Sequence, residues 1–254
     1  MRPLKISAVS YLNTKPFIYG LEHSSFLKNF DLQIDIPSVC AEKLLTNQVD
    51  IALAPVAVLP ELNDYEILTD YCIGCDGKVN SVMLFSEVPL AEIETIYLDY
   101  QSKTSVLLIQ LLAEKHWKIF PNWLIATAGY ESKIGEKTAG LVIGDRSFAL
   151  HGKFNYQFDL GEAWEKFTGL PFVFACWVAN KPIPEEIKAA FNKAVAFGIE
   201  NKFTLKNELK FSPIPNMTVD EYLEKFISYQ FDQRKKKALE LFLNSIPALS
   251  PESF

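Results

Sequence analysis

The sequence predicts an α/β protein built from two lobes. Three observations lead to this prediction. First, 49% of the 254 residues are hydrophobic, which is enough to bury a sizeable core. Second, short apolar stretches alternate with helical ones, and third, the order of strand, polar turn and helix occurs in both halves. Such alternation favours parallel sheets covered by helices, so we expect one sheet in each lobe, with the C-terminal helices packing back on the first.

The first unit begins with an apolar strand over residues 4–9, followed by a polar turn and a helix. Pro16 suits the first turn of this helix, and Asn13 or Thr14 suits the position that caps its N-terminus. The apolar pattern then predicts further strands and helices in alternation. These are a strand at 32–36, a helix from 37 through 45, a strand at 50–55 and strand candidates at 80–85 and 95–98.

The second unit has the same order, with a strand at 96–99, a polar turn at 100–105 and an amphipathic helix at 106–117. A strand and turn follow at 139–145. The stretch 171–178 is wholly apolar, as in strands that are buried on both faces.

From Pro182 onward the pattern is helical only. Helices are expected at 185–199, from a capping box at 218–221, and at 233–246. This order predicts a first lobe made of residues 1–84 with 179–254, and a second lobe made of residues 85–178.

Charge and hydropathy exclude several classes of partner. The chain carries 25 Lys and Arg residues against 31 Asp and Glu residues, and this net charge of −6 argues against nucleic acid as a partner. The basic run 234–237 is expected to be a solvated helix face. No apolar stretch approaches the ~20 residues of a membrane span, and residues 1–6 lack the features of a signal peptide. We expect a cytoplasmic protein that binds neither nucleic acid nor membrane.

The sequence offers no clear metal or cofactor site. Cys72 and Cys75 form a CxxC pattern, which in other proteins marks a redox pair or half of a zinc site. No second such pair is present, the three histidines are isolated, and no glycine-rich phosphate loop occurs. The two cysteines precede a turn rather than opening a helix, so we expect ordinary reduced thiols, no metal and no cofactor.

Two polar segments are candidates for a binding site, Ser10 to Pro16 and Ser102 to Ser105. In open α/β sheets, ligands bind beyond the carboxyl ends of the strands, often against helix N-termini that favour anions. A helix needs one capping oxygen, whereas Ser102, Thr104 and Ser105 supply three. Each segment alone is also explained as a well-capped turn. If both are sites, their places in different lobes predict a cleft that holds a ligand with two acidic ends.

The groups available to hold such a ligand are mostly uncharged. Three arginines occur in the chain, at positions 2, 146 and 234. An anion would then be held mainly by lysines, hydroxyls, amides or helix N-termini. Ser81, which opens a predicted strand, is expected near the crossing between the lobes.

Six segments lie in order along the chain, at 9–16, 49–56, 79–86, 98–105, 143–145 and 159–175. Together they resemble segments of the chorismate dehydratases of the futalosine route to menaquinone. The segment 9–16, VSYLNTKP, is similar to the N-terminal signature of that family, and 79–86 is similar to the segment with its active-site serine. The turn 98–105 resembles the family's Ser-Arg-Thr-Ser turn, with Lys103 where arginine is usual. Lysine keeps the charge and loses the bidentate fork. The other matches are at 49–56, 143–145 and 159–175.

The resemblance implies a periplasmic-binding-protein-like fold of type 2, with a ligand cleft between two lobes, used as an enzyme. It implies a lyase that removes water from chorismate, a dicarboxylate, and gives 3-[(1-carboxyvinyl)oxy]benzoate in menaquinone biosynthesis without a cofactor. By the same resemblance, Asn13 and Ser81 are the expected catalytic residues. The expected substrate-binding residues are Ser10, Thr14, Ser102, Thr104, Ser105, Gly144 and Asp145.

Two groups are candidates for taking the proton that the dehydration removes from the substrate. Amides and hydroxyls, such as those of Asn13 and Ser81, are poor bases at neutral pH. Asp145 is one alternative, although an aspartate after a strand is more often a structural acceptor. The other alternative, which we favour, is the enolpyruvyl carboxylate of the substrate itself, placed by Asn13 and Ser81.

Two further functions are compatible with the predicted fold. One is a non-catalytic solute-binding protein for a small dicarboxylate, which would usually carry a secretion signal or lipid anchor. The other is the related naphthoate synthase of the same pathway, whose N-terminal signature differs from residues 10–16 of this chain.

Overall fold

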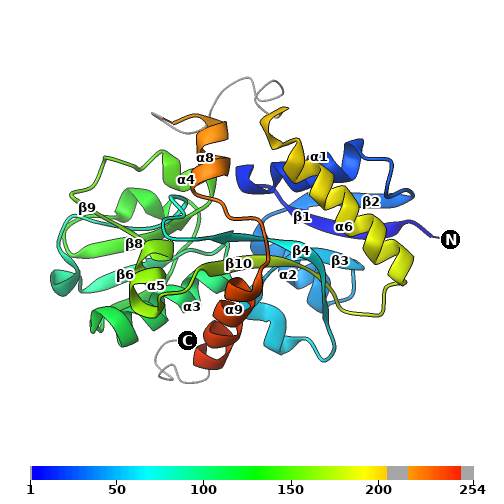
Figure 1. The fold of residues 1–254 in the computed structure, drawn as a ribbon. Helices are drawn as coiled ribbons and strands as arrows, with labels where there is room; N and C mark the ends of the chain where they lie inside the picture. Colours follow the sequence, from blue (N-terminus) through cyan, green and yellow to red (C-terminus); the bar gives the residue numbers. More distant parts are fainter. Residues whose placement is uncertain (1, 205–216, 247–254) are drawn as a thin grey trace.

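The computed structural model describes residues 2–204 and 217–246, in which the chain forms two five-stranded sheets with helices around them (Figure 1). The strand order is β2-β1-β3-β10-β4 in the first sheet and β7-β6-β8-β5-β9 in the second. The first sheet consists of β1 (Leu4–Val9), β2 (Phe30–Asp35), β3 (Ile51–Pro55), β4 (Glu66–Cys75) and β10 (Phe172–Ala179). The second consists of β5 (Val82–Ser86), β6 (Thr95–Leu98), β7 (Asn122–Ile125), β8 (Thr138–Ile143) and β9 (Tyr156–Asp159). The predicted α/β fold with two lobes is confirmed.

Both sheets are mixed, where the sequence predicted parallel ones. β1 is parallel to β2 and β3, as predicted, but β10 runs antiparallel to β3 and β4. Likewise β6 is parallel to β7 and β8, whereas β5 is antiparallel to β8 and β9. β5 and β10 are the strands by which the chain enters the second sheet and returns to the first. A strand that arrives from the other sheet is not tied to its neighbours by the helical crossover that makes strands parallel.

Strand pairing also places two strands differently from the expected lobes. β10, which the expected division put in the second lobe up to residue 178, lies between β3 and β4 of the first sheet. β5 begins at Val82, before the expected limit of residue 84, and pairs in the second sheet. The exact limits of the lobes stay a prediction, and residues 205–216 and 247–254 of the expected first lobe lie outside the described residues.

The described helices lie near most of the predicted positions, and none of them is long and apolar enough to cross a membrane. They are α1 (Lys15–His23), α2 (Pro37–Leu45), α3 (Lys103–Leu111), α4 (Asp145–Phe148), α5 (Leu160–Thr168), α6 (Glu185–Glu200), α8 (Val219–Lys225) and α9 (Gln233–Ser245). The helix predicted at 106–117 begins earlier, at Lys103, and ends in a π-helical turn over Leu112–Trp117. The sequence missed β7 because this strand is short and mostly exposed, without the alternation that marks a half-buried strand.

The predicted solvated face of the basic run 234–237 is wrong for Lys235. Its side chain is only 2% exposed, and its Nζ donates to the Ser228 Oγ at 2.7 Å and to the Gln230 carbonyl at 2.8 Å. The long apolar stem lets α9 place this ammonium group against the segment that precedes the helix. Lys235 therefore ties residues 228–230 to α9.

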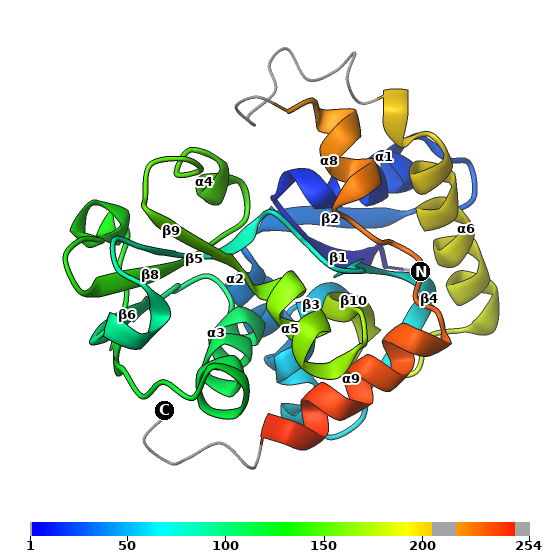
Figure 2. The ribbon, with the colours of Figure 1, turned by 60° about the vertical axis from the view of Figure 1, so that its left-hand side comes forward.

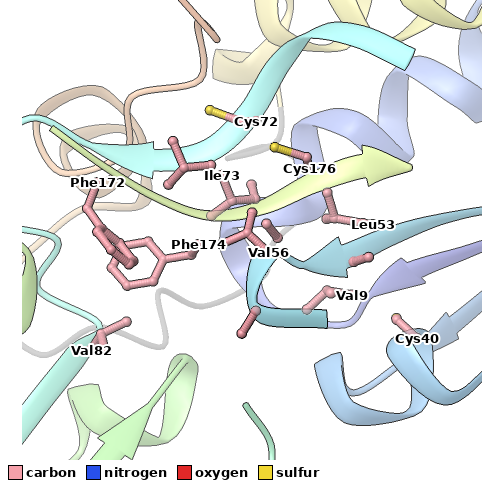
Figure 3. Close-up of a cluster of buried hydrophobic side chains, with 14 of the residues drawn as sticks. Val9, Cys40, Leu53, Val56, Cys72, Ile73, Val82, Phe172, Phe174 and Cys176 are labelled. Atoms are coloured by element: carbon pink, nitrogen blue, oxygen red, sulfur yellow. The ribbon is translucent and has the colours of Figure 1, made fainter. Parts of the chain in front are cut away.

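The CxxC pattern lies at the end of β4. Because side chains alternate along a strand, Cys72 and Cys75 point to opposite faces of the sheet. Cys72 lies opposite Cys176 of β10, and both side chains are in the buried core (Figure 3). Burial raises the pKa of the Cys72 thiol to about 12 and that of Cys75 well above its ordinary value. Over residues 2–204 and 217–246, no cluster of three or more His, Cys, Asp or Glu side chains is placed to hold a metal ion.

Helices α1 and α6 lie side by side on one face of the first sheet, with α9 on the other side of that sheet (Figures 1 and 2). Gly20 and Gly198 form the contact between α1 and α6. A Cβ on Gly20 would lie 2.1 Å from the Ala194 carbonyl oxygen, and one on Gly198 would lie 1.9 Å from the Pro16 carbonyl oxygen. The two helices are therefore in backbone contact. This packing fixes α1 and the polar turn in front of it.

We expect Gly198→Ala to lower the free energy of unfolding by about 1–3 kcal/mol, because the methyl group must push α1 and α6 apart. The urea midpoint measures this change. Gly135→Ala is the matched control, since a Cβ there meets no atom within 4 Å. Equal urea midpoints for the two variants would contradict the assigned backbone contact.

Candidate functional site

A cavity lies between the two lobes and is lined by residues of both sheets. Its apolar wall includes Val9, Leu53, Ile73, Val82 and Phe174, which belong to the buried cluster drawn in Figure 3. Its polar side chains are those of Tyr11, Asn13, Thr14, Ser81, Ser102 and Ser105. The described residues that line the cavity include no Asp, Glu, His, Lys or Arg. Burial raises the pKa of Tyr11 above its ordinary value, so this phenol is neutral as well.

Three helices of nine residues each begin at this cavity. Thr14 is the N-cap of α1, Pro37 is the first residue of α2, and Ser102 is the N-cap of α3, and all three line the cavity. The N-terminus of a helix carries a partial positive charge and N–H groups without an intrahelical partner. The cavity therefore favours an anionic ligand without a cationic side chain in its wall.

Asn13 lies in a 3-10 turn, Leu12–Thr14, and is 8% exposed. The expected cap of α1 is not formed by a side chain: Thr14 occupies the N-cap position, and neither it nor Asn13 makes a capping hydrogen bond. The Asn13 side-chain oxygen accepts from the Thr14 hydroxyl at 3.3 Å, and its carbonyl accepts from the Tyr229 hydroxyl at 2.8 Å. The explanation of residues 10–16 as a well-capped turn is therefore wrong, and the Asn13 amide remains beside the cavity.

Ser81 lies at the crossing between the lobes, as expected, directly before β5. It is 1% exposed, and its Oγ accepts from the Tyr222 hydroxyl at 2.8 Å. The preceding backbone is held by Asp159, whose carboxylate accepts from the Val79 N–H at 3.0 Å and the Asn80 N–H at 2.7 Å. Asp159 also caps α5, so one buried carboxylate fixes the approach to Ser81 and the start of that helix.

The second polar segment divides between two roles. The Ser102 Oγ accepts from the Ser105 N–H at 3.2 Å, so Ser102 caps α3 as expected, and both serines line the cavity. The hydroxyl of Thr104 instead accepts from the Ala57 N–H at 3.1 Å. Thr104 is fully buried and is not among the cavity-lining residues, so its contact joins the two lobes.

Asp145 contacts the first lobe instead of the cavity. The Leu12 N–H donates a hydrogen bond to the Asp145 carboxylate, and both carboxylate oxygens lie 3.1 Å from the Leu12 nitrogen. Burial raises the pKa of this carboxyl group. Its neighbour Gly144 has φ +64° and packs against the Tyr11 ring, where a Cβ would lie 2.5 Å from a ring carbon. The Tyr11 hydroxyl in turn donates to the Gln101 side chain.

An ion pair that the sequence did not suggest lies behind these contacts. Asp99 is 2% exposed and accepts from the Gln101 N–H at 2.9 Å, the Tyr130 hydroxyl at 2.9 Å and the Ile143 N–H at 3.0 Å. Arg146 donates to Asp99 as well. The network joins the ends of β6 and β8 and thereby fixes the turns that carry Gln101 and Gly144.

Of the nine sequence-predicted site residues, six line the cavity: Asn13, Thr14, Ser81, Ser102, Ser105 and Gly144. Ser10, Thr104 and Asp145 lie outside its lining; the Ser10 N–H donates to the Asp35 carbonyl at 2.8 Å. Sequence reasoning missed Tyr11, although it lies inside the segment VSYLNTKP. It also missed Tyr222 and Tyr229, which come from the helical C-terminal part and carry no sequence signal of their own.

Two proteins with a known activity are similar to this chain over most of its length. The chorismate dehydratase of Thermus thermophilus is 26% identical over 267 residues, covering 97% of this chain and 96% of that protein. The chorismate dehydratase of Campylobacter jejuni is 25% identical over 205 residues, covering 75% of this chain and 90% of that protein.

Solved structures agree on the fold. Protein AF1704 of Archaeoglobus fulgidus superposes with a TM-score of 0.68 at 16% identity, covering 97% of each chain. The Candida albicans CA3427 gene product, described as having the generic periplasmic binding protein fold, superposes with a TM-score of 0.60 at 12% identity, covering 98% of this chain and 92% of that one. The predicted periplasmic-binding-protein-like fold is confirmed. The sequence profile of a family described as menaquinone biosynthesis matches residues 4–247, nearly the whole chain, and the chain belongs to this family.

Proposed function

We propose that the protein removes water from chorismate and releases 3-[(1-carboxyvinyl)oxy]benzoate, as a step of the futalosine route to menaquinone in the cytoplasm. The membership of the menaquinone-biosynthesis family and the similarity to two chorismate dehydratases support this proposal. The observation in the structure that carries it is a cavity at which three helices begin and whose described lining residues include no charged side chain.

The chemistry of the substrate fits this cavity. Chorismate carries two carboxylates, and the N-termini of α1 and α2 in one lobe and of α3 in the other favour anions at both sides of the cavity. The apolar wall suits the carbon ring between the two acidic ends. We assign carboxylate binding to Ser102 and Ser105, at the start of α3, and to Thr14. Gly144 lines the cavity, but its N–H donates to the Ser81 carbonyl at 2.8 Å.

Dehydration of chorismate takes a proton from the ring carbon that bears the enolpyruvyl ether and a hydroxide from the adjacent ring carbon. The electron pair of the broken C–H bond completes an aromatic ring, and the proton and hydroxide leave as water. Much of the driving force therefore belongs to the substrate. The protein has to orient the molecule, exclude water and direct one proton transfer.

We propose that the enolpyruvyl carboxylate of the substrate takes this proton. Among the residues that the structure describes, those lining the cavity supply no carboxylate, imidazole or amine. Burial raises the pKa of the Tyr11 phenol, which also lines the cavity, so this group is neutral. Asp145, the alternative base, binds the Leu12 N–H and lies outside the cavity lining. Asn13 and Ser81 then act by placing the substrate carboxylate against the ring carbon.

Incubation of the purified protein with chorismate, followed by mass spectrometry, tests the function. We expect loss of 18 Da from chorismate and accumulation of the carboxyvinyloxy-benzoate. Binding of chorismate without turnover would instead indicate a solute-binding protein of the same fold. Absence of both binding and turnover would favour the related naphthoate synthase.

Variants at the cavity separate the proposed roles. We expect Asn13→Ala and Ser81→Ala to lower kcat on the order of 10²-fold with little change in KM, because a misplaced acceptor slows the proton transfer. Ser105→Ala should raise KM and leave kcat near wild type, as loss of uniform binding does. Steady-state kinetics with melting temperatures measured on the same preparations decides this. A folded Asn13→Ala enzyme with unchanged kcat would contradict the role given to Asn13.

The two candidate proton acceptors are separated by Asp145→Asn. An amide keeps an oxygen that accepts from the Leu12 N–H, but it does not take a proton at neutral pH. We expect kcat within about threefold of wild type, whereas loss of a general base costs roughly 10²–10⁴-fold. Asp145→Ala, which removes the contact altogether, is the companion variant and should raise KM. A collapse of kcat in Asp145→Asn would make Asp145 the base.

A further inference from the structure

Two tyrosines of the C-terminal segment contact the two residues proposed to be catalytic. Tyr222 of α8 donates its hydroxyl to the Ser81 Oγ at 2.8 Å, and Tyr229 donates to the Asn13 carbonyl at 2.8 Å. Both are buried, with exposed fractions of 1% and 5%, and neither lines the cavity. In the ribbon, α8 lies over the gap between the two sheets, where the chain passes from one lobe to the other (Figure 1).

Packing holds each tyrosine rigidly. The ring of Tyr222 packs edge-on against Phe148 of α4, with centroids 5.0 Å apart and planes at 82°. The ring of Tyr229 packs against Phe17 of α1 in the same manner, with centroids 5.4 Å apart. α8 itself begins at a side-chain cap, in which the Thr218 hydroxyl accepts from the Glu221 N–H at 3.1 Å. The position of the Tyr222 hydroxyl is therefore set by the core, independently of any ligand.

The hydrogen bond to Tyr222 fixes the direction of the Ser81 hydroxyl. A phenol and a serine hydroxyl each have one proton to donate, and Tyr222 gives its proton to the Ser81 Oγ. Complete burial raises the pKa of Tyr222, so the phenol stays protonated and remains the donor. The Ser81 proton must then point elsewhere. The acceptor within the protein is the Val79 carbonyl, at a long 3.4 Å, and the other direction is the cavity that Ser81 lines.

We propose that Tyr222 is a positioning residue that holds Ser81 as a hydrogen-bond donor toward the substrate carboxylate in the cavity. This inference rests on the proposed dehydration of chorismate. Ser81 touches the substrate, and Tyr222 acts through Ser81. Without the Tyr222 hydroxyl, the Ser81 Oγ loses its donor and the side chain can adopt other rotamers, so fewer molecules present the Ser81 proton to the ligand.

The test is a double-mutant cycle on chorismate turnover with Tyr222→Phe, Ser81→Ala and the double variant. Tyr222→Phe keeps the ring and its contact with Phe148, and its fold is checked by melting temperature. We expect kcat to fall about 10- to 100-fold with KM within about threefold. In the Ser81→Ala background, the same change should lower kcat by a clearly smaller factor, because the main group through which Tyr222 acts is already gone. The remaining effect reports the hydrogen bond between Tyr222 and the Asn13 side chain.

Tyr130→Phe is the matched control. It also removes a fully buried phenol, one that donates to Asp99, but it has no contact with Ser81. Its effect should be the same in the wild-type and Ser81→Ala backgrounds. Incorporation of 4-aminophenylalanine at position 222 places an N–H donor where the phenol was, so it should restore at least part of kcat. If Tyr222→Phe is too unstable to assay, this variant is compared with the wild type instead.

Two results would overturn the proposal. One is a Tyr222→Phe enzyme with kcat within twofold of wild type. The other is an equal loss on changing Tyr222 with and without Ser81, which would make Tyr222 a residue of general structural importance. A wild-type protein that does not turn over chorismate would instead refute the proposed function, so the two failures are distinguishable.

Discussion

The contact between the Tyr11–Leu12 turn of the first lobe and the Gly144–Asp145 turn of the second joins the two lobes beside the cavity. Tyr11 and Leu12 make three contacts with the second lobe. The Tyr11 ring packs on Gly144, the Leu12 N–H donates to the Asp145 carboxylate, and the Tyr11 hydroxyl donates to the Gln101 side chain. Each depends on the others, since Gly144 must lack a Cβ for the ring to approach and Asp145 must follow directly. The Asp99–Arg146 pair fixes the second turn from behind. The contact ties the two lobes together where Tyr11 and Gly144 line the cavity.

The neutral lining has an energetic consequence for a ligand with two charges. Moving a carboxylate from water into a cavity is costly unless polar groups replace its hydration. Fixed hydroxyls and helix N-termini do so without a counter-ion, and they need no reorganisation during the reaction. An arginine or lysine at the same place would neutralise the substrate carboxylate and lower its basicity. A neutral wall therefore suits a substrate that has to accept its own proton.

The sequence predicted much of the fold and part of the site. The strand–turn–helix order predicted both lobes. Six predicted residues line the cavity: two from the segment VSYLNTKP, Ser81, the serines at 102 and 105, and Gly144. It failed where a role depends on pairing across the chain. The sequence predicts Asp145 and Thr104 as ligand-binding groups. In the structure, Asp145 accepts from the Leu12 N–H and Thr104 accepts from the Ala57 N–H, both in the other lobe. Tyr222 lies 141 positions from Ser81, and no local pattern marks such a contact.

The place of β10 in the first sheet sets an order in which the chain can acquire its structure. The second sheet is built from one continuous stretch, residues 82–159, so its strand pairs are complete once that stretch has left the ribosome. The first sheet has to wait, because β10, at residues 172–179, is the strand that joins β3 to β4. Until then β4 is an unpaired ten-residue edge, of the kind that associates with other chains. The second sheet can therefore form before the first, although it comes later in the sequence. The first sheet is completed only by β10, a strand that follows the whole second sheet along the chain.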